Sequence, residues 1–291
     1  DLVDALDDAK SSQTVRLLAN ATMNRGFYVG SGESVTLDLN GHDISPADPF
    51  TGDRLFQAYQ GGTLRVTGEG TIRSDRSDIF IFTIFNDSRV IIESGVTVTN
   101  TGSSCIYIGN NGSVVDIYGT VTTDGAFSVQ GNGTQHGTTI NIYPGAYIQG
   151  ESYAIYHPQN GDLNIFGGTL VGSTCGIEMR NGTITVSGDA KITGGTGGPH
   201  STFNDSGSTT SNAALAIAPY EGTTIGVNIS GGTFNGGAGL YASHPNDTAG
   251  TTPSTINLNI TGGTFIGGTF NGTNYSVYST GETGFIHDGS F

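Results

Sequence analysis

Three carboxylates in the middle of the chain are the best candidates for acid–base chemistry. Glu178 lies in the strand-like segment GIEMRNG, the first strand of its repeat. Glu221 follows the first strand of the next repeat, and Asp162 begins the second strand of the preceding repeat. Glycoside hydrolysis needs two carboxyl groups, about 5–5.5 Å apart for retention or about 6.5–9.5 Å for inversion. Strand spacing puts Glu178 and Glu221 roughly 11 Å apart. A glycoside hydrolase site therefore requires their side chains to converge.

A recurring set of aromatic and polar residues suggests ligand binding in place of catalysis. The tyrosines at or near corresponding outward positions are Tyr59, Tyr107, Tyr156 and Tyr220. The polar residues expected around them are Gln57, His157, Glu178 and Arg180. Tyrosine offers a flat apolar ring and a polar tip, which suit a sugar ring and its hydroxyls. We predict a glycan-binding face that uses Tyr107, Tyr156, His157, Arg180 and Tyr220; the alternative is that the tyrosines are ordinary outward residues that only cover the strands.

The direction of these side chains depends on the strand register. If Tyr107 points outward, its neighbour Ile108 points inward. Counting back from the turn glycine instead puts Ile108, His157 and Glu178 in one column. Because a shift of one residue turns every side chain to the opposite face, the sequence leaves open whether Tyr156 or His157 is exposed.

Other chemistries have less support in the sequence. A polysaccharide lyase needs a base and cations that neutralise a uronate, and Arg180 with Lys191 is the one pair available within a repeat. There is no His-x-x-x-His or Cys-x-x-Cys pair, and GGTGGPHST (194–202) lacks the aspartate of calcium-binding repeats. No G-x-S-x-G elbow is present. We expect no metal site and no cofactor.

The charge balance excludes several classes of partner. The chain has 25 acidic and 10 basic residues, for a formal net charge of −15. A nucleic-acid groove needs a basic stripe, and an anionic membrane surface attracts basic segments; the sequence has neither. No segment approaches the ~20 apolar residues of a membrane span. We expect neither nucleic-acid binding nor membrane insertion.

The elements that must position these residues are short strands in a repeating unit. The segment 106–125, IYIGNNGSVVDIYGTVTTDG, alternates three strands with glycine turns, and 154–174 and 176–198 repeat that order. Three-strand repeats of roughly 20–27 residues are typical of a solenoid. We predict an all-β fold, a single-stranded right-handed parallel β-helix of about nine three-strand coils. Because one coil cannot bury its inner face alone, we expect a single domain over residues 1–291.

Several features mark the corners, ends and insertions of the predicted β-helix. The GGT of ISGGTFNGG (229–237) and ITGGTFIGG (260–268) is expected to form the corner between second and third strands. DLVDALDDAK (1–10) predicts a helix that caps the first coil. The insertions 194–212 and 243–254 would form the wall of a groove if they flank the tyrosines.

The two cysteines are predicted to be free thiols. Cys105 and Cys175 hold the same offset from a turn glycine, so we expect them in one apolar column, three coils apart. Three coil steps correspond to about 14 Å, which is beyond the reach of a disulfide. Two unpaired cysteines do not decide the cellular compartment.

The segment TVRLLANATMNRGFYVGSGESVTLDLNGHDIS (14–45), followed by repeats of the form NISGGTF (228–234), carries a family resemblance. It resembles the right-handed β-helix regions of large surface proteins from Gram-positive gut bacteria, with the architecture of the pectate-lyase-like superfamily. That superfamily includes lyases, glycoside hydrolases, phage tailspikes and adhesins, so the resemblance implies the fold and an extracellular location more than a reaction. No catalytic motif of the superfamily is matched residue by residue.

Three functions follow as hypotheses. The first is an extracellular, cell-surface binding module or adhesin. It recognises a glycan, from a polysaccharide or a glycoprotein, or a host surface ligand along the solenoid face, and is a monomer as an isolated domain. The alternative is a glycoside hydrolase, or less favourably a polysaccharide lyase, on the same face. The third is a passive stalk, which predicts no groove at all.

Overall fold

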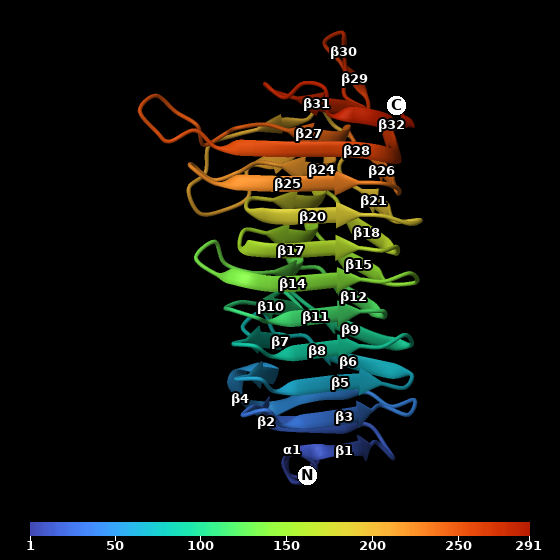
Figure 1. Ribbon diagram of the computed structural model, residues 1–291. Helices are drawn as coiled ribbons and strands as arrows, with labels where there is room; N and C mark the ends of the chain where they lie inside the picture. Colours follow the sequence, from blue (N-terminus) through green and yellow to red (C-terminus); the bar gives the residue numbers. More distant parts are fainter.

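The computed structural model describes residues 1–291 and shows a rod built from stacked coils (Figure 1). The chain climbs from the N-terminus at one end to the C-terminus at the other. Apart from two short antiparallel pairs, the strands belong to one 28-stranded sheet whose pairings are all parallel. The fold is the predicted right-handed parallel β-helix with a short N-terminal helix.

Three strands form each coil, and they align with their equivalents in the next coil. The first strands are β2 (Ala21–Val29), β4 (Ile44–Tyr59), β7 (Phe80–Phe85), β10 (Ile106–Ile108), β13 (Phe127–Gln130), β16 (Tyr153–His157), β19 (Cys175–Met179), β24 (Ala213–Ile217), β27 (Ala238–Ala242) and β31 (Val277–Ser279). The second strands are β1 (Ser11–Arg16), β3 (Ser34–Asp38), β5 (Thr63–Thr67), β8 (Arg89–Ile92), β11 (Val114–Ile117), β14 (His136–Ile142), β17 (Asn160–Ile165), β20 (Gly182–Val186), β25 (Thr224–Ile229), β28 (Thr255–Ile266) and β32 (Ile286–Ser290). The third strands are β6 (Gly70–Ser74), β9 (Val96–Asn100), β12 (Thr120–Thr123), β15 (Tyr147–Gly150), β18 (Thr169–Gly172), β21 (Lys191–Thr193) and β26 (Thr233–Asn235). β28 continues into this position, and β2 and β4 begin in it before they continue as first strands.

Alternation of apolar and polar residues explains why these segments are strands. In β12 and β15, for example, Val121 and Ile148 are fully buried while their neighbours Thr120 and Tyr147 are half-buried. β-branched side chains pack well on such a half-buried surface. Their inward residues join one core cluster of 59 buried residues that runs through the rod.

The number of coils differs from the prediction. The rod has about eleven turns where the sequence predicted about nine. The additional second strands are β1 at the N-terminal end and β32 at the C-terminal end. All residues of β32 and all but one of β1 are exposed, so neither shows the apolar alternation that marks the other coils in the sequence.

The N-terminal helix α1 (Leu2–Asp8) covers the first coil. Asp1 caps it in a reciprocal capping box with Asp4, and Val3 and Leu6 are buried. The helix contacts β2, as Figure 1 shows at the N-terminal end. It is seven residues long, and no helix of the protein is long and apolar enough to cross a membrane.

The GGT corner is confirmed between β17 and β18. Gly168 has a φ of +89°, a conformation that L side chains rarely adopt. A Cβ atom there would lie 2.8 Å from the carbonyl oxygen of Ala146. Glycine is therefore required at this corner both by the backbone conformation and by the close approach of the preceding coil.

The register of the first strands settles which side chains point outward. Tyr107 aligns with Gln130, Gln130 with Tyr156, and Tyr156 with Glu178. His157 aligns with Met179, which belongs to the core. The alternative column that joined His157 to Glu178 is therefore wrong, and Tyr156 shares the outward column with Tyr107.

Both cysteines are free and buried, as predicted, but they lie in different columns. Cys105 belongs to the main core inside the coils. Cys175 aligns with Tyr153 and Ala213 and belongs to a small cluster on the outer side of the first strands. The expectation of a common column is wrong, because Cys175 is displaced by one residue.

Candidate functional site

A cavity of about 660 Å³ lies on the outward side of the first strands, over β10, β13 and β16. The aromatic residues in its lining are Tyr107, Phe127, Tyr156 and Tyr220. The amides are Gln130, Asn132, Asn181 and Asn246, and the carboxylates are Asp205 and Glu221. The cavity therefore combines flat apolar surfaces with many uncharged donors and acceptors.

The aromatic part of the cavity is held by ring packing and one hydrogen bond. Phe127 and Tyr156 come from adjacent coils and stack with ring centroids 4.9 Å apart. The hydroxyls of Tyr156 and Tyr220 lie 3.0 Å apart. Tyr107 packs against Phe85 at 5.7 Å between centroids. Because each ring is fixed by a neighbour, little conformational entropy remains to be lost on binding.

The two insertions supply the far side of the cavity. Within 194–212, β22 (His200–Ser201) and β23 (Thr210–Ser211) form an antiparallel hairpin. Its tip contributes Asp205, Ser206 and Gly207 to the lining, and the 243–254 insertion contributes Asn246. The expected groove beside the tyrosines is thus present, and it is enclosed by residues far apart in the sequence.

Arg180 holds both insertions against the solenoid. Its side chain is fully buried, and its guanidinium lies 4.0 Å from the centroid of the Tyr220 ring. The guanidinium nitrogens donate to the carbonyl oxygens of Asn204, Gly207 and Ala218 and to Oδ1 of Asn246. Arg180 therefore lies behind the cavity wall, and all three of its nitrogens have protein partners.

Glu178, two residues before Arg180 and within β19, anchors the hairpin as well. Its Oε1 atom accepts hydrogen bonds from the amide of Thr209 at 2.8 Å and from the Thr209 hydroxyl at 2.6 Å. The side chain is fully buried, and Oε2 has no hydrogen-bond partner. Burial raises the pKa of Glu178 to about 7 from its ordinary value of 4.5, against the opposing effect of the Thr209 hydrogen bonds. Glu178 does not line the cavity.

The structure brings together only part of the predicted site. Tyr107, Tyr156, Tyr220 and Glu221 line the cavity. His157 points into the rod, where its Nδ1 atom lies 3.3 Å from the carbonyl oxygen of Asn181. Burial lowers the pKa of His157 to about 4, which keeps the ring neutral near pH 7.

The three predicted carboxylates are not assembled at one place. Glu178 is covered by the hairpin, Glu221 lies in the cavity lining, and Asp162 lies on the second strand β17 outside that lining. The lyase pair is separated in the same way, because Arg180 is buried at the end of β19 whereas Lys191 is exposed on the third strand β21. Neither the three carboxylates nor the Arg180–Lys191 pair lines one common cavity.

Sequence reasoning missed several lining residues. Phe127 aligns with Tyr153, three positions before the Tyr107–Tyr156 column. Strict alternation would place Phe127 on the inward face with Val129, so the strand pattern could not have found it. Asn132 and Asn181 lie in turns, whose polar residues carry no signal that separates a ligand contact from a turn former. Asn246 and Asp205 depend on how the insertions fold back.

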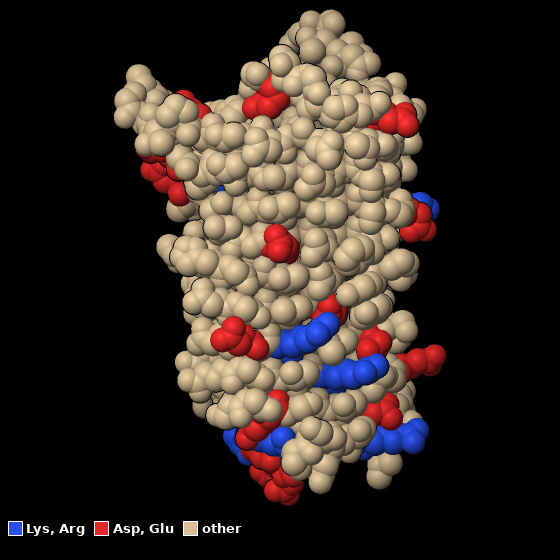
Figure 2. All heavy atoms as spheres, viewed as in Figure 1, with Lys and Arg blue, Asp and Glu red and all other residues tan.

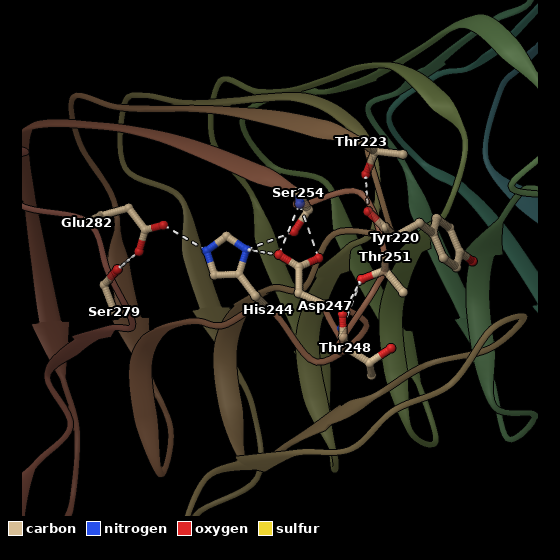
Figure 3. Close-up of polar contacts among 9 residues, drawn as sticks. All are labelled: Tyr220, Thr223, His244, Asp247, Thr248, Thr251, Ser254, Ser279 and Glu282. Atoms are coloured by element: carbon tan, nitrogen blue, oxygen red, sulfur yellow. Dashed lines mark hydrogen bonds and ion pairs between the residues drawn. The ribbon is translucent and has the colours of Figure 1, made fainter.

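A second polar cluster lies near the C-terminal end (Figure 3). His244 Nδ1 is 2.7 Å from the hydroxyl of Ser254, and Nε2 is 2.9 Å from Oε1 of Glu282. Ser279 donates to the other oxygen of Glu282. A hydroxyl, an imidazole and a carboxylate in this order, each within hydrogen-bond distance of the next, are the arrangement of an activated nucleophile.

The surroundings of Ser254 do not suit nucleophilic catalysis. Asp247 lies 3.5 Å from His244 Nδ1 and accepts the backbone N–H of Ser254 at 3.0 Å. An oxyanion that formed at Ser254 would meet this carboxylate and would lose that N–H as a donor. The cluster instead connects the 243–254 insertion, through His244, to Glu282 in the segment after β31, and this contact supports the last coil (Figure 3).

The comparisons with known proteins assign no relative to this fold and site. No family model, no curated protein and no solved structure matches the chain. Function is therefore inferred from the geometry of the cavity.

Proposed function

We propose that the protein is an extracellular binding module that recognises a glycan in the cavity beside the hairpin. The observation that carries the proposal is a cavity of about 660 Å³ in which four aromatic side chains face amides and hydroxyls. Its volume lies within the range of small-molecule sites, about 300–1,000 Å³. The extracellular, cell-surface location and the pectate-lyase-like superfamily belong to this proposal and are supported by the resemblance of residues 14–45.

The chemistry of the lining supports a sugar ligand. Aromatic rings offer flat apolar surface to the C–H face of a sugar ring, and Tyr107 is half-exposed in the cavity. Amide side chains such as Asn132 and Asn181 both donate and accept, which matches hydroxyl groups that do the same. A passive stalk predicts no such cavity.

A second candidate function is glycoside hydrolysis within the same cavity. Asp205 and Glu221 are both in the lining, although neither pairs with the buried Glu178. Cleavage of a bound oligosaccharide would support this function, whereas binding without turnover supports a binding module. The same samples serve both tests, because products are detected by chromatography after the binding assay.

A glycan array followed by calorimetry tests the proposal. We expect the chain to bind at least one oligosaccharide and Tyr107→Ala to weaken that binding about tenfold, as expected for the loss of one stacking ring. Tyr147→Ala is the matched control, because Tyr147 is a half-buried tyrosine on the third strand β15, outside the cavity. Absence of binding to any glycan at millimolar concentration would show the proposal to be wrong.

A further inference from the structure

The cavity lies in a part of the chain that has almost no positive charge. Eight of the ten basic residues precede residue 90, and only Arg180 and Lys191 follow it. Over the same stretch, residues 90–291, there are 12 acidic residues. In Figure 2 most Lys and Arg side chains on the visible face accordingly lie near the N-terminal end.

The charged groups of the lining are all acidic. Asp205 and Glu221 are exposed and face the cavity. Arg180 is fully buried and each of its nitrogens already donates to a protein oxygen. Lys191 lies on β21, which is not part of the lining. A carboxylate or sulfate on a ligand would therefore find two like charges and no free cation.

Aromatic surface in the lining also favours a positively charged group over an uncharged one. One face of the Tyr220 ring is already covered by the Arg180 guanidinium, 4.0 Å from the ring centroid, so the surface open to a ligand cation is that of the other rings. Tyr107 and Phe127 present further aromatic surface in the same cavity, and a cation over such a ring is attracted by its quadrupole.

We propose that the cavity selects a glycan that carries a protonated amino sugar and that it discriminates against uronates and other acidic sugars. This inference rests on the proposed function and specifies its ligand class. Each exposed carboxylate is expected to favour the amino form over the neutral form about two- to fivefold. The preference should decrease when salt screens the charges.

The test compares three forms of one β-linked trisaccharide backbone: with amino groups, with neutral hydroxyls, and with carboxylates at C6. Affinities are measured by calorimetry at about pH 6, where an aliphatic amine is protonated. We expect the order amino, neutral, acidic, and a smaller spread in about 0.5 M NaCl. In the double variant Asp205→Asn, Glu221→Gln the ratio of amino to neutral affinity should fall to about one. Asp189→Asn, an exposed acid outside the cavity, should leave the wild-type ratio unchanged.

The possible failures are distinguishable. If the acidic form binds as tightly as the amino form, the charge preference is refuted while carbohydrate binding stands. If trilysine competes as well as the amino sugar, the cavity recognises a cation without a sugar and the inference is overturned. If none of the three forms binds and the glycan array is also negative, the proposed function itself fails.

Discussion

Replacing Glu178 by glutamine should remove part of the pH dependence of the protein's stability, because the buried carboxyl group that holds the hairpin can then no longer ionise. The carboxyl group has a pKa of about 7 in the folded protein and an ordinary value of 4.5. Because the folded pKa is the higher one, the folded state binds the proton more tightly than the unfolded state. The contribution of protonated Glu178 to the free energy of unfolding is fully present at low pH and is lost as the pH rises through 7.

The magnitude follows from the two pKa values. Between about pH 5 and pH 8, ionisation of this buried group should lower the free energy of unfolding by about 2–3 kcal/mol. Glutamine cannot ionise, and its amide oxygen can accept the same hydrogen bonds from Thr209 that Oε1 accepts now. We therefore expect Glu178→Gln to be close to the wild type near pH 5 and more stable near pH 8.

Urea denaturation of the wild type and Glu178→Gln at the two pH values measures this difference. Glu151→Gln is the matched control, because Glu151 is exposed and its side chain makes no hydrogen bond or ion pair. Glu178→Ala should be destabilised at both pH values, since it leaves the Thr209 donors unpaired. If Glu178→Gln loses as much stability near pH 8 as Glu178→Ala, the reasoning is refuted, because the charge would then be stabilising.

Two other perturbations test the contacts that hold the insertions. Arg180→Ala should free the hairpin, because it removes hydrogen bonds to both insertions at a cost of about 3 kcal/mol in the free energy of unfolding. Thiol labelling of the folded protein should then become faster at Cys175, which lies beneath Thr210. Labelling of Cys105, in the main core, should not change. Equal labelling of both cysteines would indicate global unfolding and would count against a local anchor. Replacing His244 by alanine should loosen the segment that follows β31 by about 1–2 kcal/mol, because Glu282 keeps Ser279 but loses its contact with the 243–254 insertion. Limited proteolysis should then cleave between residues 279 and 286 sooner, and an unchanged cleavage rate would show that the His244–Glu282 contact does not hold this segment.

The fold could be predicted because its determinants are local and repeated. Alternation within segments such as IYI and TVTT, with glycine at the corners, specifies a three-strand coil, and stacking of coils follows from the need to bury one face. The end coils were missed because β1 and β32 are almost wholly exposed and carry no such alternation. Cys175 was placed one residue out of register, since periodicity fixes the coil but not the phase of each strand.

The site was predicted less completely because it depends on contacts between distant segments. The outward tyrosines Tyr107 and Tyr156 follow from strand periodicity. The burial of Glu178 and Arg180 does not, because it is caused by a hairpin that begins after residue 194 and folds back over β19. An outward position on a strand predicts an exposed side chain only where no insertion covers the strand. Strand periodicity does not determine which strands an insertion covers.

The direction of the sheet hydrogen bonds determines how the rod would respond to force. In a stack of parallel coils these bonds run along the rod axis, so tension along that axis loads them directly and separates one coil from the next. Each coil contacts only its neighbours, so the rupture of one interface leaves the others intact. Extension would therefore proceed in steps, each releasing one coil of roughly 20–27 residues, or about 70–90 Å of extended chain. A protein of this design yields gradually under load, and the coils nearest the ends are released first.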